Sequence, residues 1–244
     1  MGDKSYRAVI ELGICTDTYD IEGIITSVQD HSSVGRTELV FALQKLKGNL
    51  LQSVPKYSAL KLNGKRMYDM ARKGIPTEQK IRPVILHDIT LVSFESPHVT
   101  MDIQCGKGFY VRSLAHDLGQ TLGCGAHLSE LRRTKAGPFL LENAVQLEDA
   151  LRCISDGEPE KVVLNADLCI SDFPKLQLDN TQINLIRNGR KIINDQIIGK
   201  VNKDSLVRAY QNDGKFVAIL KQTCKANEWH PEKVFYSQKC TDGS

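Results

Sequence analysis

Alternation of apolar and polar residues marks the clearest strands of this chain. Residues 4–13 place Tyr6, Ala8, Ile10 and Leu12 on one face, which predicts a half-buried strand. The same alternation predicts strands over 84–94 and 98–105, which we expect to pair antiparallel across the turn Glu95-Ser96-Pro97. A further strand is predicted over 24–28.

A helical repeat follows the strand that ends at Cys105. Apolar residues spaced as on one buried helix face are Val111, Leu114, Ala115, Leu118 and Leu122, and Gly123 and Gly125 end the pattern. Shorter helices are predicted over 66–73 and 145–155. Another is expected to begin at Thr37, as its cap, and to end at Gly48. Residues 52–66 are predicted to be loop and hairpin, with Asn63-Gly64 as the tight turn.

A break at 156–172 divides the chain into two predicted domains, residues 1–160 and 165–244. Beyond it, a helix is expected near 180–187, and Gln211-Asn212-Asp213-Gly214 should join the strands 206–210 and 215–220 as a hairpin. One more short strand is predicted at 233–236. The predicted fold class is α+β, with a mixed, mainly antiparallel sheet, flanking helices and a small β-rich C-terminal domain.

Composition excludes several classes of protein. The chain of 244 residues has 41% hydrophobic residues, enough for a core, and no apolar run of membrane-spanning length. Its N-terminal residues lack an apolar signal region, and its seven cysteines form no CxxC pair. We therefore expect free thiols and a cytoplasmic protein without metal or membrane contact.

The strand-to-helix junction at Gly106-Lys107-Gly108 is the strongest candidate site. Phe109, Tyr110 and Arg112 follow this turn, where aromatic, cationic and free backbone N–H groups would face one place. Such a set suits a planar, negatively charged ligand such as a nucleotide. Although the net charge is only +3, basic residues cluster locally in two runs, and either run could be a solvated face or a phosphate-binding surface. The runs are Lys61, Lys65, Arg66, Arg72 and Lys73, and Arg132, Arg133 and Lys135.

Taken together, these motifs resemble those of the bacterial tRNA pseudouridine synthase B (TruB) family. The resemblance covers nearly the whole chain. It is carried by Tyr6 to Gly23 with Thr16-Asp17-Thr18-Tyr19-Asp20, by Gln52 to Gly74 with Tyr57-Ser58-Ala59, by Lys107 to Arg133 with Gly123-Cys124-Gly125-Ala126-His127-Leu128, and more weakly by Arg187 to Ala218, which is similar to a PUA-like RNA-binding domain.

The resemblance implies isomerisation of the T-loop uridine of tRNA, uridine 55, to pseudouridine, without a cofactor. It implies that Tyr6 stacks on the flipped base, that Tyr110 and Leu131 line the pocket, and that Arg112 pairs with a nucleophilic aspartate. A plainer alternative, as an ordinary core or strand residue, exists for Tyr6, Tyr110 and Leu131. Lys61, Lys65, Lys107, Arg132 and Arg133 are expected to contact tRNA phosphates. Arg187, Arg190 and Arg208 are as consistent with acceptor-stem contacts as with solvated surface.

One departure from the family concerns the nucleophile. The family carries it in a Gly-x-Leu-Asp-Pro segment upstream of the strand that begins here near Tyr6, and the printed sequence has no such segment. We expect a fragment or a misplaced start, with a degenerate protein or half of a split enzyme as alternatives. The sheet should then lack its first strands, and Arg112 should be a costly unpaired guanidinium.

Two other functions remain open at this point. A non-catalytic tRNA-binding protein or RNA chaperone would keep the stacking and basic residues without the nucleophile. A relative working within a guide-RNA complex is the third hypothesis, but the Thr16–Asp20 and Cys124–Leu128 runs are more similar to the stand-alone bacterial type. The expected partner is the T arm of tRNA, and the expected oligomeric state is monomer.

Overall fold

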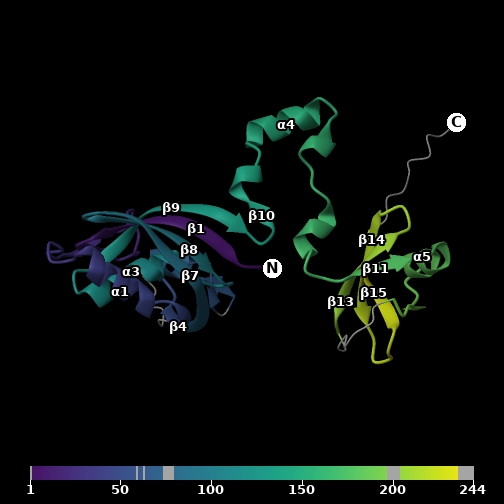
Figure 1. Cartoon of the computed structure of the whole chain (residues 1–244), viewed down its shortest axis with the longest axis horizontal. Helices are drawn as coiled ribbons and strands as arrows, with labels where there is room; N and C mark the ends of the chain where they lie inside the picture. The colour runs from purple at the N-terminus through teal and green to yellow at the C-terminus, as the bar shows by residue number, and fades with distance from the viewer. Residues whose placement is uncertain (1, 59, 63, 74–79, 197–203, 236–244) are drawn as a thin grey trace. The chain divides into compact units, whose positions relative to one another are not determined.

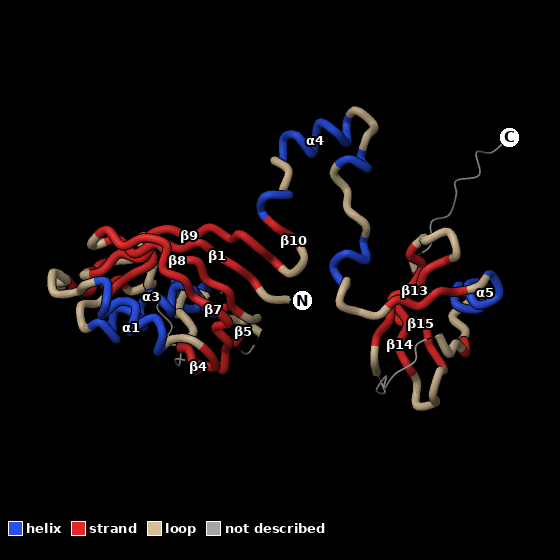
Figure 2. Tube along the Cα trace, viewed as in Figure 1, coloured by secondary structure: helices blue, strands red, loops and turns tan. Residues whose placement is uncertain are grey.

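The computed structural model describes residues 2–58, 60–62, 64–73, 80–196 and 204–235, and it divides into two compact units, 1–146 and 147–244. Each unit has its own sheet and its own hydrophobic core (Figures 1 and 2). The α+β class predicted from the sequence is confirmed. Among the described residues, no helix is both long and apolar enough to cross a membrane.

The first unit is built on a six-stranded sheet in the order β10-β9-β1-β8-β7-β4. All its pairings are antiparallel. Its strands are β1 (Lys4–Leu12), β4 (Gly48–Ser53), β7 (Ile81–Glu95), β8 (His98–Cys105), β9 (Ala126–Ala136) and β10 (Phe139–Leu140). Two small hairpins accompany the sheet: β2 (Ile14–Thr16) with β3 (Ile25–Val28), and β5 (Lys61–Leu62) with β6 (Lys65–Arg66).

Strand β1 lies in the interior of this sheet, paired with β8 on one side and β9 on the other. The edge strands among the described residues are β10 and β4, so the strand nearest the N-terminus is not left as an open edge. The sequence did not predict β4 or β9 as strands. Strand β9 reads Ala-His-Leu-Ser-Glu-Leu-Arg-Arg-Thr-Lys-Ala, which lacks a sustained alternation of apolar residues.

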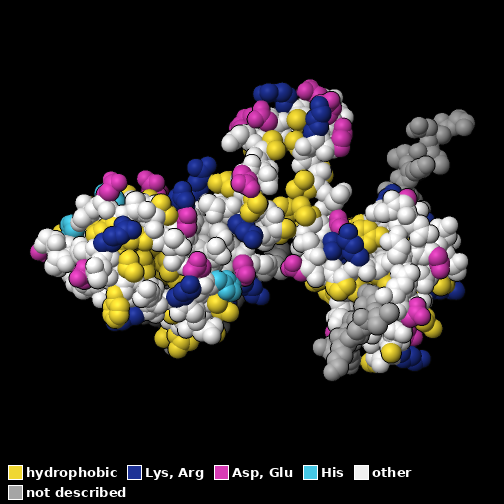
Figure 3. Space-filling model, in the orientation of Figure 1, with side chains coloured by type: hydrophobic (Ala, Val, Ile, Leu, Met, Phe, Trp, Pro, Cys, Tyr) yellow, Lys and Arg dark blue, Asp and Glu magenta, His cyan; other side chains and the backbone are white. Residues whose placement is uncertain are grey.

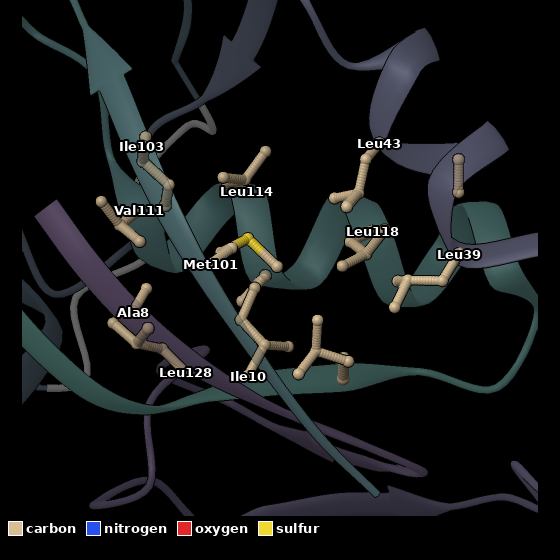
Figure 4. Close-up of a cluster of buried hydrophobic side chains, with 14 of the residues drawn as sticks. Ala8, Ile10, Leu39, Leu43, Met101, Ile103, Val111, Leu114, Leu118 and Leu128 are labelled. Atoms are coloured by element: carbon tan, nitrogen blue, oxygen red, sulfur yellow. The ribbon is translucent and has the colours of Figure 1, made fainter. Parts of the chain in front are cut away.

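The helices of this unit are α1 (Arg36–Lys45), α2 (Met67–Arg72) and α3 (Val111–Leu122), with the 3-10 turn η1 (Leu141–Asn143) after β10. Helix α3 buries the predicted face, and Gly123 ends it in the left-handed conformation with φ 78°. Figure 4 shows α3 lying across the sheet, with Leu39 and Leu43 of α1 pointing towards it. The cap predicted at Thr37 is wrong: Gly35 precedes the helix and Thr37 lies inside it.

The second unit carries a five-stranded sheet in the order β11-β13-β14-β15-β12. Its strands are β11 (Lys175–Leu178), β12 (Ile192–Ile193), β13 (Leu206–Gln211), β14 (Phe216–Gln222) and β15 (Glu228–Val234). The predicted 206–220 hairpin is confirmed, whereas the last strand begins earlier than expected. The helices of the second unit are α4 (Leu147–Ser155) and α5 (Asn180–Arg187), with 3-10 turns η2 (Pro159–Lys161) and η3 (Ala166–Ile170).

Candidate RNA-binding and catalytic site

Hydrogen bonds from side chains of both elements join the start of α3 to β4. Gln52, which is 2% exposed, accepts a hydrogen bond from the backbone N–H of Tyr110 (2.8 Å) and donates one to its carbonyl (3.0 Å). The hydroxyl of Ser113 donates to the carbonyl of Ser53 at 2.6 Å. The N–H of Tyr110 is therefore not free for a ligand, contrary to the expectation from the sequence, because a buried amide already satisfies it.

Arg112 has partners in this site, so the prediction of an unpaired guanidinium is wrong. Its Nη2 donates to the carbonyl of Tyr57 at 2.9 Å, and its Nε lies 4.0 Å from Oδ2 of Asp20. The side chain is 27% exposed and retains access to water. Since 4.0 Å is the outer limit of an ion pair, Arg112 keeps donors available for another oxygen ligand.

Asp20 is held in place by a neighbouring threonine. The Thr16 hydroxyl donates to the carbonyl of Asp20 (2.8 Å) and accepts from its N–H (3.0 Å), and Thr16 is 4% exposed. The N–H of Ile21 donates to the carbonyl of Leu128 on β9 at 2.9 Å, which ties the loop to the sheet. A role for Asp20 at Arg112 could not be predicted from the sequence, because 92 residues separate the two and no local pattern joins them.

Tyr6 and Leu131 are brought to the face of the sheet that α3 covers. Tyr6 lies opposite Arg133 and Ala8 lies opposite Leu131 in the β1–β9 register, so these four side chains share one face. The Arg133 guanidinium carbon is 5.5 Å from the centre of the Tyr6 ring, and Tyr6 is 8% exposed. Leu131 is 47% exposed, which departs from the ordinary core leucine that its sequence context favoured.

The predicted basic residues do not form one surface. Lys107 is exposed in the turn before α3, and Arg132 lies opposite Arg7, on the face of the sheet away from Tyr6. Lys61 and Lys65 lie in the β5–β6 hairpin, and their side chains fall outside what the structure describes.

Two arginines differ from the set of RNA contacts that the sequence predicted. Arg208 in the second unit is 8% exposed and bonded within the protein, which argues against both alternatives from the sequence, an acceptor-stem contact and a solvated surface. Arg82 on β7 was not predicted as a site residue, and its guanidinium lies 3.8 Å from the position that a Cβ on Gly108 would take. It therefore adds a cation beside the turn that carries Lys107. No group of acidic, histidine and cysteine side chains suited to a metal ion occurs in the described ranges.

The fold is shared with chains of two solved complexes. The chain superimposes on a chain of an H/ACA ribonucleoprotein bound to a substrate RNA containing 2′-deoxyuridine with a TM-score of 0.68 and 19% identity, covering 97% of this chain and 67% of that one. A chain of a Cbf5–Nop10–Gar1 complex gives 0.67 and 22%, with 96% and 67% covered. These likenesses define the architecture alone.

Sequence comparison defines the class as pseudouridylate synthase. Residues 1–111 match the N-terminal domain of TruB family pseudouridylate synthases, and residues 112–169 match the C-terminal domain of tRNA pseudouridylate synthase B. The chain is 36% identical to tRNA pseudouridine synthase B of Clostridium tetani over 220 residues, covering 90% of this chain and 74% of the relative. It is 40% identical to that of Methylobacillus flagellatus, with 92% and 72% covered. The chain belongs to the tRNA pseudouridine synthase B family.

Proposed function

We propose that this protein is a tRNA pseudouridine synthase that isomerises uridine 55 in the T loop. The observation that carries the proposal is the convergence of three family motifs on the first turn of α3. Asp20 comes from the first motif, Gln52 and Tyr57 from the second, and Arg112 from the third, and hydrogen bonds or an ion pair join them directly. Family membership supplies the reaction that such a site would perform.

The uridine must leave its stack to react, and stacking in the site would offset that cost of a few kcal/mol. The proposed stacking residue is Tyr6, whose ring is now covered by the guanidinium of Arg133. A base and a guanidinium are both planar groups that favour an aromatic face, so an incoming uridine would displace Arg133 towards a phosphate. Leu131 and Tyr110 would line the pocket, with Leu131 offering its exposed apolar side chain.

The reaction needs a carboxylate nucleophile, which the family carries in a Gly-x-Leu-Asp-Pro segment absent from residues 1–244. Arg112 is proposed to meet that carboxylate with the donors not used by the Tyr57 carbonyl. In this proposal residues 1–160 form the catalytic-type domain and 165–244 a PUA-like domain that binds RNA. The partner is tRNA through its T arm, and the protein acts as a monomer.

The test combines the intact mass of the protein from its natural source with a pseudouridine assay. That protein should convert uridine 55 of an unmodified tRNA transcript, and a transcript with cytidine at this position should remain unchanged. A natural mass above 27.2 kDa, with the aspartate motif in the extra sequence, would accompany activity. Specific tRNA binding without any pseudouridine would instead support the non-catalytic tRNA-binding protein, and absence of both would refute the proposal.

A matched pair of variants tests the role of Arg112. Arg112→Lys keeps the charge but loses the planar fork, and it should lower the rate of pseudouridine formation by about 100-fold while tRNA affinity changes little. The control is Arg7→Lys, because Arg7 is paired with Asp102 on the opposite face of the sheet. Equal losses in both variants would contradict the assignment.

A further inference from the structure

A hollow at the β9–β10 edge of the first unit has no role in the site described above. Its volume is about 510 Å³. It is lined by Ser5 of β1, by Arg132, Thr134 and Lys135 of β9, and by Leu140, Leu141 and Glu142 at β10 and the turn after it. We refer to these residues as the β9–β10 hollow.

The register of β1 and β9 places this hollow and the proposed uridine site on opposite faces of the sheet. Ser5 lies opposite Lys135, and Arg7 lies opposite Arg132, so these side chains share the face that α3 does not cover. Between them, the register shifts by one residue and leaves Thr134 without a partner on β1, which is a β-bulge. The neighbours Arg132 and Arg133 therefore point to opposite faces of one strand.

The basic side chains of the hollow form no ion pair among the described residues. Neither Arg132 nor Lys135 has a carboxylate within ion-pair distance in the part of the chain that the structure describes, whereas Arg7 on the same face is paired with Asp102 at 2.7 Å. Glu142 is the acidic side chain of the lining. Dark-blue basic side chains stand over β9 at the edge of this unit in Figure 3.

This set of groups suits a phosphodiester backbone. A guanidinium, an ammonium and two hydroxyls are the side-chain donors that proteins commonly direct at phosphate oxygens. Leu140 and Leu141 are 37% and 38% exposed and offer an apolar edge for a ribose. Because the hollow adjoins the edge strand β10, an RNA that passes around this edge can reach both faces of the sheet.

We propose that the β9–β10 hollow is a second RNA site, which binds backbone phosphates of tRNA outside the T arm. The inference rests on the proposed function, since it takes the T loop to occupy the Tyr6 face. An isolated T-arm hairpin held on that face would leave the hollow empty. A whole tRNA, with a second arm beyond the T arm, would fill it.

The experiment measures affinity and its salt dependence for two RNAs: an unmodified tRNA transcript and an isolated T-arm hairpin. The variant is Arg132→Gln/Lys135→Gln, and the matched control is Arg7→Gln/Lys47→Gln, which removes two cations that are each paired with a carboxylate. The variant should bind whole tRNA about 10-fold more weakly, with the slope of log K against log salt reduced by about 1 to 2, and should bind the hairpin as the wild type does.

Other outcomes would contradict either the second RNA site or the proposed function. Unchanged tRNA affinity, equal losses for both RNAs, or an equal loss in the control would overturn the inference while leaving the uridine site untouched. A wild-type chain that bound neither RNA above an unrelated hairpin would count against the proposed function itself. The charge-retaining variant Arg132→Lys/Lys135→Arg should keep most of the tRNA affinity, which separates loss of charge from disturbance of the bulge.

Discussion

At the scale of single residues, a ring stack between Tyr19 and His116 of α3 supports the loop that carries Asp20. Tyr19 has φ 61°, a left-handed conformation unusual for a residue with a Cβ. Its ring stacks on His116, with centres 4.0 Å apart and planes inclined by 15°. The N–H of Leu128 also donates to the Tyr19 carbonyl at 3.0 Å. Stacking and this hydrogen bond together offset the cost of the strained backbone.

His116 and the adjacent Asp117 should make stability depend on pH in opposite directions. Burial lowers the pKa of His116, so its contribution is present above its ordinary value of 6.5 and is lost as pH falls below it. Burial raises the pKa of Asp117 from 3.8 to about 6, so its contribution is present below 3.8 and is lost as pH rises through 6.

Asp117→Asn should therefore stabilise the protein at neutral pH. We expect a gain of about 1–2 kcal/mol at pH 7.5, after allowance for partial solvent screening, because the variant no longer buries a charge. The gain should shrink as pH falls through 6 and vanish well below pH 3.8, where the wild-type carboxyl is protonated in both the folded and the unfolded state. Denaturant unfolding across this pH range measures it, with His116→Phe as a companion that keeps the stack. A gain independent of pH would contradict the explanation.

At the scale of elements, the close approach of α3 to β9 depends on a glycine inside the helix. A Cβ on Gly119 would lie 2.2 Å from the backbone nitrogen of Ala126 and 2.4 Å from the carbonyl carbon of Gly125. The carbonyl of Gly119 also accepts from the N–H of Gly125 at 3.0 Å. A methyl group at position 119 would therefore force α3 to move away from β9.

Gly119→Ala should destabilise the first unit by about 3 kcal/mol, although alanine is the better helix former by about 1 kcal/mol. The reason is that the obstructing atoms are backbone and cannot rotate aside. Thermal or denaturant unfolding measures the loss, and Gln120→Ala at the neighbouring exposed position serves as the control. A neutral or stabilising effect would show that α3 and β9 can separate without cost.

At the scale of the whole molecule, each unit has its own hydrophobic core. In the second unit, a network of polar side chains joins residues 167–173 to the sheet. Asp167 accepts hydrogen bonds from Nη1 of Arg208 (3.2 Å) and from the hydroxyl of Tyr210. Arg208 also donates to the carbonyls of Phe173 (2.9 Å) and Ser171 (2.8 Å). Burial first, and then the Asp167 hydrogen bond, raises the pKa of Tyr210 to about 12. These contacts fasten residues 167–173 to strand β13.

Asp167→Ala should destabilise the second unit by about 3 kcal/mol, because it leaves a buried guanidinium without its carboxylate. Trp229, the single tryptophan of the chain, is 1% exposed in the core of this unit, so its fluorescence reports unfolding of this unit. The tryptophan transition should move to lower denaturant while circular dichroism retains the transition of the first unit. A single shared transition for both probes would show that the units unfold together.

Local sequence patterns determined much of this fold. The alternation in β1 and β8, the buried stripe of α3 and the glycine that ends it are short-range signals, and the structure contains all three where they were predicted. The motif residues Tyr6, Tyr110, Arg112 and Leu131 could also be named from the sequence, because the family resemblance runs along the chain. Their roles remain proposals, to be decided by the experiments above.

The tertiary structure decided which of these residues meet. Arg112 finds Asp20 and the Tyr57 carbonyl through contacts spanning 92 and 55 residues, which no helical or strand period can encode. Whether Arg132 or Arg133 faces Tyr6 depends on the pairing register of β9 and its bulge, since side chains alternate between faces along a strand. The sequence therefore determined the family and many of the elements, but not strands β4 and β9. Their pairing determined the site, because proximity across a sheet is a property of register rather than of composition.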